Sequence, residues 1–386
     1  MKIVYILSGH FCPVSGAGIT LWSLIKHIAP RHHVEVYANS WEADLPAEIT
    51  MHRLSPIARY PSTKLDFFFP LRIVCNYFSA TRLCRRLRAE ADILHIYNGL
   101  AANPRLLISQ LMCQKAAMEE RARESLVGRL SQQTPKHLLL RLLERHVYNR
   151  RHRYRKLIPA SQFEKEQILK YYHVPPEEII PVHGGVDYEA FNPPDKERRR
   201  KAIREKYGYS SRDVVCLFVG YDFRRKGLKY LLRAMPLIDA EVKLLAVGGV
   251  GSLPEYRKIA SELGVEERVT FSGPVYDNCR DFFHAADLFI FPTLFDPFGT
   301  VVVEAMAAGL PVITSRRVGA AELITPGKDG LLLEDPKDGR EIARLADSLL
   351  EKSAADAMGA AARTTARRCT WEAKAKELVS AYENLS

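Results

Sequence analysis

Residues 287–314 read DLFIFPTLFDPFGTVVVEAMAAGLPVIT, and this stretch decides the fold. It begins with an apolar run at residues 287–292, which suits a buried parallel strand. A loop follows, and Gly299 is predicted to open a helix that ends at Gly309. Residues 312–314 then begin another strand. A strand–loop–helix–strand unit of this kind is typical of an α/β domain built on a parallel sheet.

The loop of this unit has the features of a ligand site. In open α/β sheets, ligands bind at the carboxyl edge, and a helix N-terminus offers unpaired N–H groups to a phosphate. Asp296 precedes the helix and Glu304 lies within it. A carboxylate repels a phosphate but accepts hydrogen bonds from sugar hydroxyls, so we expect both acids to bind another part of the ligand. An ordinary strand–helix turn with solvated acids fits the spacing equally well.

Asp296-Pro297-Phe298-Gly299 and residues 304–312, EAMAAGLPV, resemble the acid-x7-acid motif of retaining GT-B glycosyltransferases of family 4. The usual form there is E-P-F-G … E-A-M-A-x-G-x-P-V, so Asp296 replaces a Glu. The resemblance implies an α/β GT-B fold, with two Rossmann-like parallel-sheet domains that face a cleft. It also implies transfer of a hexose from a nucleoside diphosphate sugar, with a UDP-sugar favoured.

Residues 185–187, GVD, resemble the end of the family motif P-N-G-V-D, which closes the N-terminal domain. Beyond it the composition shifts to a charged run, and strands alternate with helices at βαβ spacing. We therefore expect an acceptor-binding domain at residues 1–186 and a nucleotide-sugar-binding domain at residues 187–368. By resemblance, a helix at residues 369–386 should cross back and pack on the first domain.

A second candidate anion site follows the strand predicted at residues 214–219. Arg225 and Lys226 come just before the next helix, where a guanidinium and an ammonium suit a diphosphate. The helix opened by Gly299 and Thr300 would hold the same diphosphate from the other side. Two solvated cations in a turn are the alternative.

The N-terminus also begins as an α/β unit. Residues 3–7 are predicted to form a strand, residues 10–18 a flexible glycine-containing loop and residues 19–28 a helix. An NAD-dependent oxidoreductase would need a third glycine where Leu21 stands and an acid after the second strand, and both are missing. In GT-B enzymes this loop approaches the donor diphosphate, and Gly16 is the residue that matches it.

The resemblance assigns a role to each candidate residue. Lys226 and Arg225 would stabilise the charge that develops on the departing diphosphate, so that no metal ion or other cofactor is needed. Glu304 would hold the ribose hydroxyls, Asp296 the transferred sugar and the backbone at Val275 the base. The acceptor would attack on the face that the diphosphate leaves. The expected catalytic residues are Lys226, Arg225 and Asp296, and the expected donor-binding residues are Gly16, Val275, Phe298, Gly299, Thr300 and Glu304.

Two further stretches resemble the subgroup of this family that acts on the lipopolysaccharide core. One is DFRRKG at residues 222–227, and the other is HVEVY at residues 33–37 followed by SWEAD at residues 40–44. Tyr221 stands where the family usually has Arg. These stretches predict a lipopolysaccharide core or another glycan or lipid-linked saccharide as acceptor. A nucleotide-sugar epimerase of the same fold is the alternative.

Residues 92–97 are predicted to form a strand that carries His95, and residues 101–155 to be mostly helical. The family often has a histidine on this strand, usually with a structural role, and a catalytic role is the alternative.

None of the seven cysteines forms a C-x-x-C pair or clusters with histidine at metal-ligand spacing. We therefore expect reduced thiols in a cytoplasmic protein. The apolar run at the N-terminus is too short for a signal peptide.

The formal net charge of +11 is unevenly placed. From Arg105 to Lys156 there are 13 basic residues and four acids, an excess of +9. No stretch is apolar enough to span a membrane, so we expect this segment to hold the protein on the inner face of an anionic cytoplasmic membrane. A solvated basic face, or a site for acceptor phosphates, is the alternative. Nucleic acid is not expected, because the donor site gives it no role.

Overall fold

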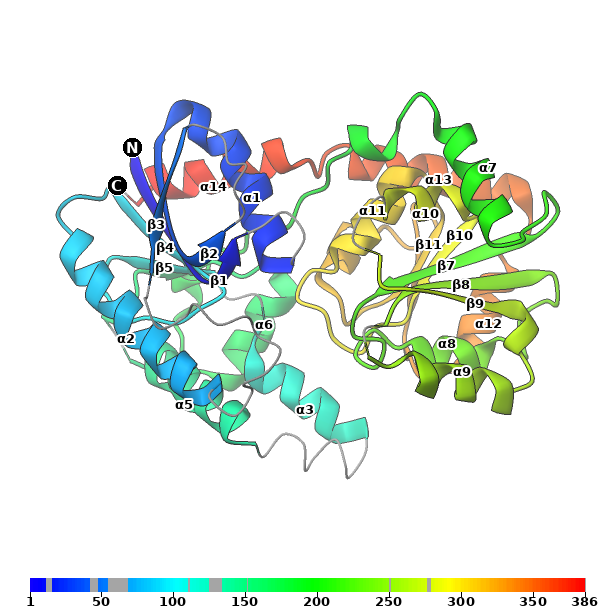
Figure 1. Ribbon diagram of the computed structural model, residues 1–386, viewed down its shortest axis with the longest axis horizontal. Helices are drawn as coiled ribbons and strands as arrows, with labels where there is room; N and C mark the ends of the chain where they lie inside the picture. Colours follow the sequence, from blue (N-terminus) through cyan, green and yellow to red (C-terminus); the bar gives the residue numbers. More distant parts are fainter. Residues whose placement is uncertain are drawn as a thin grey trace. The chain divides into compact units, whose positions relative to one another are not determined.

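The computed structural model describes residues 1–11, 16–41, 48–54, 69–109, 112–124, 134–150, 152–249, 251–275 and 279–385. They form two compact units (Figure 1). The N-terminal unit comprises Met1–Gly184 together with Trp371–Ser386, and the C-terminal unit comprises Gly185–Thr370. Each unit is built on a six-stranded sheet. None of the helices within these residues has the length and apolarity that a membrane span requires.

The N-terminal unit has a parallel sheet with the strand order β3-β2-β1-β4-β5-β6. Its central strands are buried because helices cover both faces. The strands are β1 (Lys2–Phe11), β2 (His33–Trp41), β3 (Ile49–Arg53), β4 (Ile93–Tyr97), β5 (Leu106–Ser109) and β6 (Lys156–Leu157). The helices are α1 (Gly16–Ile28), α2 (Phe69–Leu87), α3 (Gln114–Glu124), α5 (Pro135–Tyr148) and α6 (Gln162–Tyr171).

The first strand is longer than predicted, and the loop after it is shorter. After a register shift, His10 and Phe11 pair with Ser40 and Trp41 in the sheet. The predicted loop is therefore wrong at its first two positions, because pairing with β2 continues past the apolar run. It is also wrong at residues 16–18, because α1 begins at Gly16 and not at residue 19. The middle of the loop, residues 12–15, lies outside the described residues.

The prediction of a mostly helical segment at residues 101–155 is wrong at β5. All four residues of β5 are buried, and the strand pairs with β4 on one side and β6 on the other. Its short apolar run, LLIS, has the composition of a buried helical turn as much as that of a strand. Only the order of the strands in the sheet distinguishes the two.

The C-terminal helix α14 (Trp371–Glu383) belongs to the core of the N-terminal unit. Trp371, Ala375, Leu378 and Tyr382 are buried in the same hydrophobic cluster as residues of β1 and α1. Burial of such side chains stabilises the unit by roughly 1.5–3 kcal/mol for each large one. The helix α14 therefore packs into the core of the N-terminal unit and is part of that unit.

His95 has a structural role in this core. It is fully buried, its Nδ1 lies 2.6 Å from the Tyr382 hydroxyl and its Nε2 lies 2.8 Å from the Ser109 hydroxyl. The Tyr382 hydroxyl also lies 3.0 Å from that of Tyr5. Burial lowers the pKa of His95 to about 3, so the ring is neutral. Both ring nitrogens are occupied inside the core, which leaves no atom for catalysis.

The C-terminal unit has a parallel sheet with the strand order β12-β11-β10-β7-β8-β9. The strands are β7 (Val214–Gly220), β8 (Val242–Gly248), β9 (Val269–Gly273), β10 (Leu288–Phe291), β11 (Val312–Ser315) and β12 (Leu331–Leu333). The helices are α7 (Lys196–Lys206), α8 (Leu228–Ala234), α9 (Leu253–Glu262), α10 (Arg280–Ala285), α11 (Thr300–Ala308), α12 (Gly339–Asp347) and α13 (Lys352–Ala366). The predicted strand–loop–helix–strand unit is confirmed as β10, α11 and β11.

Short 3-10 helices join several of these elements. They are η1 (Ala29–Arg31), η4 (Pro176–Glu178), η5 (Glu189–Phe191), η6 (Glu266–Arg268) and η7 (Gly319–Leu323).

An ion-pair network fixes β10 beside β7. The carboxylate of Asp287, just before β10, accepts hydrogen bonds from Arg200 at 2.6 Å and from Arg204 at 3.2 Å. It also accepts the backbone N–H of Val215 in β7 at 2.8 Å. Charge-assisted bonds of this kind are among the stronger hydrogen bonds in proteins. They hold in register the two neighbouring strands whose carboxyl ends carry the candidate site.

Candidate functional site

Two turns meet at the carboxyl edge of the C-terminal sheet. One runs from β7 to α8 and the other from β10 to α11, and β7 and β10 are neighbouring parallel strands. The backbone oxygen of Arg225 accepts the N–H of Leu294 at 2.9 Å and the hydroxyl of Thr293 at 3.2 Å. Gly227 adopts a φ of 82°, and a Cβ there would lie 1.9 Å from the Pro292 oxygen. The close approach of the two turns therefore requires glycine at this position.

The ammonium of Lys226 is hydrogen-bonded to the carboxylate of Asp296. The two side chains are 14% and 9% exposed, so the ion pair is largely removed from water. The ammonium also lies 5.2 Å from the centre of the Phe291 ring. Burial and the neighbouring Arg225 guanidinium lower the pKa of Lys226. The nearby Asp222 carboxylate acts in the opposite direction and favours the charged ammonium.

Arg225 supports the loop that carries Asp296. Its Nη1 donates to the backbone oxygen of Phe295 at 2.9 Å and lies 3.8 Å from the Asp296 carboxylate. Its Nε lies 3.4 Å from the carboxylate of Asp222. The structure thus brings together all three predicted catalytic residues, Lys226, Arg225 and Asp296. It also gives Arg225 a positioning role that the sequence pattern did not indicate.

The N-terminus of α11 lies directly after Asp296 in the same loop. Gly299 precedes the helix with a φ of 76°, and a Cβ there would lie 2.4 Å from a methyl group of Val318. Thr300 is the first helical residue, and no side chain caps the helix. First-turn N–H groups without a side-chain acceptor are suited to an anion. Phe298 is 5% exposed and fixes the loop by accepting the N–H of Ala320 at 2.7 Å.

Glu304 lies on α11, and its side chain is half-buried. Burial raises the pKa of its carboxyl to about 7, and the nearby Arg280 opposes the shift. The same carboxyl contributes to the raised pKa of Cys279, which places Glu304 beside the start of α10. A carboxyl group near half-ionisation at neutral pH is a recognised feature of functional sites. The described contacts do not join it to the Lys226–Asp296 pair, so the two predicted acids occupy different parts of this edge.

Val275 follows β9 and is contacted by a residue that sequence reasoning did not select. The hydroxyl of Tyr221 donates to the backbone oxygen of Val275 at 3.2 Å, and Tyr221 is 51% exposed. Tyr221 stands at the position where the family usually has Arg. This departure from the family pattern is the sequence feature that could have marked Tyr221 as a site residue. Asp222 was also missed: its carboxylate accepts the N–H of Arg225 at 3.2 Å. Residues 276–278, which follow Val275, lie outside the described residues.

Gly16 belongs to the N-terminal unit and begins α1. It therefore lies at the carboxyl edge of the other sheet.

A metal site was not found in the part of the chain that the structure describes, because those residues contain no group of three or more His, Cys, Asp or Glu that could hold an ion. The need for a metal ion stays a matter of prediction.

The chain matches glycosyltransferase families along most of its length. Residues 14–190 match the family described as Glycosyltransferase Family 4, and residues 199–365 match the family described as Glycosyl transferases group 1. Among curated relatives, a D-inositol 3-phosphate glycosyltransferase of Mycobacterium marinum is 32% identical over 237 residues, which cover 59% of this chain and 49% of the relative. An uncharacterized glycosyltransferase of Methanocaldococcus jannaschii is 28% identical over 232 residues, which cover 59% of each protein. The chain spans about half the length of the curated relatives that it matches.

Solved glycosyltransferase structures have the same fold. WaaG, a glycosyltransferase involved in lipopolysaccharide biosynthesis, superimposes with a TM-score of 0.76 at 22% identity, over 98% of this chain and 99% of that one. HepE of Anabaena, solved in complex with UDP-glucose, gives a TM-score of 0.68 at 21% identity over the full length of both chains. The two parallel-sheet units therefore have the GT-B architecture, as the sequence predicted.

Proposed function

We propose that this chain, whose halves match two glycosyltransferase families and whose fold is GT-B, transfers a hexose from a UDP-sugar to a glycan or glycolipid with retention of the anomeric configuration. The observation that carries the proposal is the meeting of Lys226, Arg225, Asp296 and the N-terminus of α11 at one sheet edge. Cationic groups and N–H groups that converge there suit a diphosphate, and the acid among them suits a sugar hydroxyl.

The Lys226–Asp296 pair supports a specific account of donor binding. A diphosphate carries two negative charges and competes with one carboxylate for the same ammonium. When the diphosphate is contacted by Lys226 and the N–H groups after Gly299, the Asp296 carboxylate is free to accept a hydrogen bond from the transferred sugar. Each ligand contact therefore replaces an existing one, and neither charge is left buried and unpaired.

The same groups account for catalysis. As the bond between the anomeric carbon and the diphosphate breaks, negative charge grows on the departing oxygen. Preorganised cations and N–H groups stabilise this charge more in the transition state than in the ground state. Lys226 lies in a site from which water is largely excluded, which strengthens the effect. We propose that these groups supply the positive charge without a metal ion, and that the acceptor attacks on the face that the diphosphate leaves.

We assign the nucleoside to the other end of this edge. Glu304 accepts hydrogen bonds from the ribose hydroxyls, and the backbone at Val275 contacts the base. Tyr221 reaches the Val275 oxygen with its hydroxyl and is half-exposed, so its ring is suited to pack against the base. The UDP-glucose complex of HepE supports the choice of a uridine nucleotide, and the match to WaaG supports a lipopolysaccharide core or lipid-linked saccharide as acceptor.

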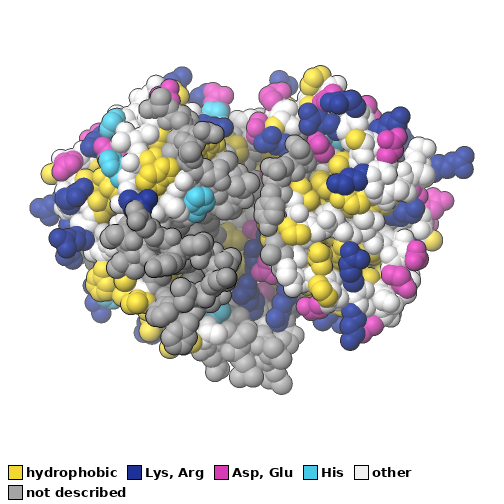
Figure 2. All heavy atoms as spheres, in the orientation of Figure 1, with side chains coloured by type: hydrophobic (Ala, Val, Ile, Leu, Met, Phe, Trp, Pro, Cys, Tyr) yellow, Lys and Arg dark blue, Asp and Glu magenta, His cyan; other side chains and the backbone are white. Residues whose placement is uncertain are grey.

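We further propose that the N-terminal unit recognises the acceptor and rests on the inner face of an anionic membrane through α2 and α5, which pack together. Four of the seven large apolar side chains that are exposed in the described residues belong to these helices. They are Leu71, Phe78, Leu138 and Leu142. In Figure 2, Lys and Arg side chains gather at the left edge of this unit, over α2, with exposed hydrophobic side chains below them.

The charge of these helices favours an anionic surface. The sequence of α2 contains no acid, and the single acid of α5, Glu144, is buried. Arg141 and Arg145 are exposed on α5. Each such residue near an anionic leaflet contributes about 1 kcal/mol of binding free energy. The combination gives reversible peripheral attachment. Residues 110–111, 125–133 and 151 of the predicted basic segment lie outside the described residues.

The proposed function is tested by offering purified protein a panel of nucleotide sugars with uridine, guanosine and adenosine bases. We expect a UDP-hexose to raise the melting temperature most, and transfer to a core saccharide or lipid-linked acceptor to give a product with the anomeric configuration of the donor, read by NMR. A product of inverted configuration would refute the retaining mechanism. Stabilisation by NAD with no response to any nucleotide sugar would refute the transferase assignment.

A further inference from the structure

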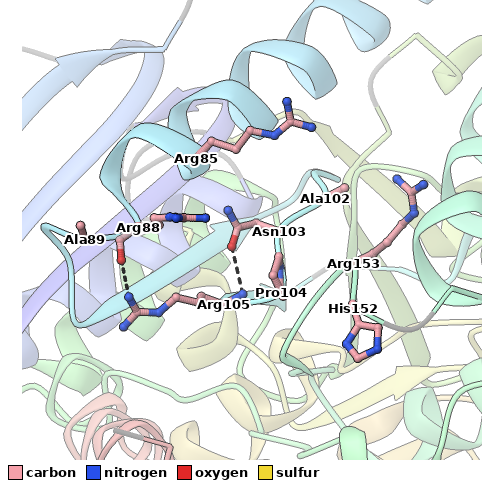
Figure 3. Close-up of a pocket in the computed structure, with 9 residues that line it drawn as sticks. All are labelled: Arg85, Arg88, Ala89, Ala102, Asn103, Pro104, Arg105, His152 and Arg153. Atoms are coloured by element: carbon pink, nitrogen blue, oxygen red, sulfur yellow. Dashed lines mark hydrogen bonds between the residues drawn. The ribbon is translucent and has the colours of Figure 1, made fainter.

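A basic pocket opens at the surface of the N-terminal unit (Figure 3), with a volume of about 620 Å³. Its walls come from three separate segments of the chain. Arg85 and Arg88 come from the C-terminal end of α2 and the turn after it, Arg105 from the segment before β5, and Arg153 with His152 from the segment before β6. In the view of Figure 3, Arg88 and Arg105 lie on one side of the pocket, and His152 and Arg153 lie on the other.

The pocket is at the amino edge of the N-terminal sheet. Arg88 precedes β4, Arg105 immediately precedes β5 and Arg153 precedes β6, and these three strands are parallel neighbours. Gly16, by contrast, follows β1 and begins α1 at the carboxyl edge. The pocket is therefore separated by the length of the sheet from the loop that matches the donor-approaching loop of the family. A ligand in it would not be the donor or the reacting end of the acceptor.

The charge of the pocket is of one sign. Four of its nine lining residues are arginines and none is an acid. Within the described residues, no carboxylate forms an ion pair with Arg85, Arg88, Arg105 or Arg153. Like charges that are crowded together raise the free energy of the folded protein unless an anion neutralises them. Arginine is also the side chain best suited to bidentate contact with phosphate oxygens.

The walls are tied together by hydrogen bonds that involve the pocket residues themselves. The guanidinium of Arg105 donates to the backbone oxygen of Arg88. Asn103, which is 4% exposed, donates its N–H to the backbone oxygen of Arg153 at 2.8 Å and accepts the N–H of Arg105 at 2.9 Å. These bonds hold the three segments in place before any ligand arrives. A preorganised site loses less conformational freedom on binding.

We propose that this pocket binds a phosphate group, as a second anion site distinct from the donor site of the C-terminal unit. The chemistry is that of a phosphomonoester, phosphodiester or diphosphate held by several guanidinium groups. Such a group has two sources, an anionic phospholipid headgroup or a phosphate on a soluble molecule. The site does not depend on the proposed transferase function, because none of its residues is assigned to donor binding or catalysis.

The test measures binding of inorganic pyrophosphate by calorimetry, and co-sedimentation with phosphatidylcholine vesicles that contain or lack phosphatidylglycerol. The pocket variant is Arg88→Gln/Arg153→Gln. A control variant of equal charge, Arg31→Gln/Arg233→Gln, removes two exposed arginines elsewhere. Lys226→Gln reports binding at the donor site. If an altered circular dichroism spectrum shows that the double variant is misfolded, the single variant Arg85→Gln takes its place as the pocket variant.

We expect the pocket variant to weaken binding at the pocket at least tenfold while the control variant keeps it, and we expect Lys226→Gln to remove only the pyrophosphate that binds at the donor site. If the pocket variant loses pyrophosphate binding, the pocket binds a phosphate on a soluble molecule. If the pocket variant loses only its binding to vesicles with phosphatidylglycerol, the pocket binds the phosphate of the lipid headgroup. The proposal is overturned if the pocket variant binds both probes as the control variant does, or if Lys226→Gln alone abolishes pyrophosphate binding.

Discussion

The ammonium of Lys226 is bound to the carboxylate of Asp296, although the two residues are 70 positions apart in the chain. The contact joins the β7–α8 turn to the β10–α11 loop and shields both charges from water. Its partners are the two residue types that a sugar diphosphate needs, a cation for the phosphate and an acid for the hydroxyls. The Lys226–Asp296 ion pair therefore has no net charge before a ligand binds.

Replacement of Lys226 by Ala should lower transfer activity by roughly 10- to 100-fold, because a charge-assisted contact of about 1.5–3 kcal/mol is lost. The matched control is Lys229→Ala, three residues further along and exposed on α8. Steady-state rates of both variants with the same UDP-sugar check the prediction. Activity of Lys226→Ala within a factor of two of the control would remove Lys226 from the mechanism.

The loop geometry can be tested at Gly299 without changing any charge. Gly299→Ala should destabilise the protein by about 1–3 kcal/mol and weaken donor binding, because the residue has a positive φ and its Cβ would meet Val318. Gly264→Ala is the control, since Gly264 has a φ of 65° with open space around its Cβ position. Chemical denaturation and donor titration of both variants separate the steric clash from the backbone strain. Equal effects in the two variants would contradict the packing argument.

Glu304 should make donor binding depend on pH. Burial raises its pKa to about 7, so the carboxylate that accepts the ribose hydroxyls forms as pH rises through 7. Between pH 6 and 8 the affinity for a UDP-sugar should increase, by up to roughly tenfold. The diphosphate of a nucleotide sugar does not titrate between pH 6 and 8, so it does not contribute to this pH dependence. Glu304→Gln should bind more weakly and show a flat profile; a profile equal to that of the unmodified protein would contradict the assignment.

The same pKa shift has a consequence for stability. An unfolded glutamate ionises near 4.5, whereas folded Glu304 keeps its proton up to about pH 7. In this window the folded protein binds more protons than the unfolded chain, so the free energy of unfolding falls as pH rises. Glu304→Gln should reduce that fall. Melting temperatures of both proteins at pH 5 and pH 8 measure the difference, and parallel curves would contradict the burial of the carboxyl.

Tyr382→Phe should destabilise the N-terminal unit by about 1–3 kcal/mol, because the buried His95 loses a hydrogen-bond partner. Activity of the folded enzyme should be unchanged, since His95 has a structural role. The control is Asn384→Ala, an exposed change just beyond the same helix. Urea unfolding followed by tryptophan fluorescence compares the two. A large loss of activity without loss of stability would restore a catalytic role for this network.

The proposed membrane attachment through α2 and α5 gives a further prediction. Replacing Arg141 and Arg145 by Gln should reduce co-sedimentation with phosphatidylglycerol vesicles several-fold, and the reduction should be smaller at high salt, which screens the attraction. Leu138→Gln/Leu142→Gln should weaken binding at both salt concentrations, because its contribution is apolar. Binding that is insensitive to lipid charge would rule out α5 as an electrostatic anchor.

The central β10–α11–β11 unit could be predicted from the sequence because its signals are local. The apolar run before Pro292 and the glycines at positions 299 and 309 act within a few residues of the elements they bound. β5 could not be predicted, because a four-residue apolar run suits a strand or a helical turn. Its identity depends on neighbours at residues 93–97 and 156–157.

The sequence predicted that Lys226, Arg225 and Asp296 belong to one site, but not how they contact one another. Residue types and motif spacing pointed to Lys226, Arg225 and Asp296, yet assigned the cations and the acid to separate parts of the ligand. Their direct pairing depends on β7 and β10 being adjacent, which only the tertiary structure shows. The basic pocket was beyond sequence analysis for the same reason. Its arginines come from three segments that the order of β4, β5 and β6 brings together.

The position of α14 in the N-terminal core sets an order for events on the ribosome. Synthesis proceeds from the first residue to the last, and domains generally fold as they emerge. Here the C-terminal unit ends at Thr370, and the helix that supplies Tyr382 to the N-terminal core is made after it. The unit that is translated first is therefore the last to close, because part of its apolar core stays uncovered until α14 has been synthesised.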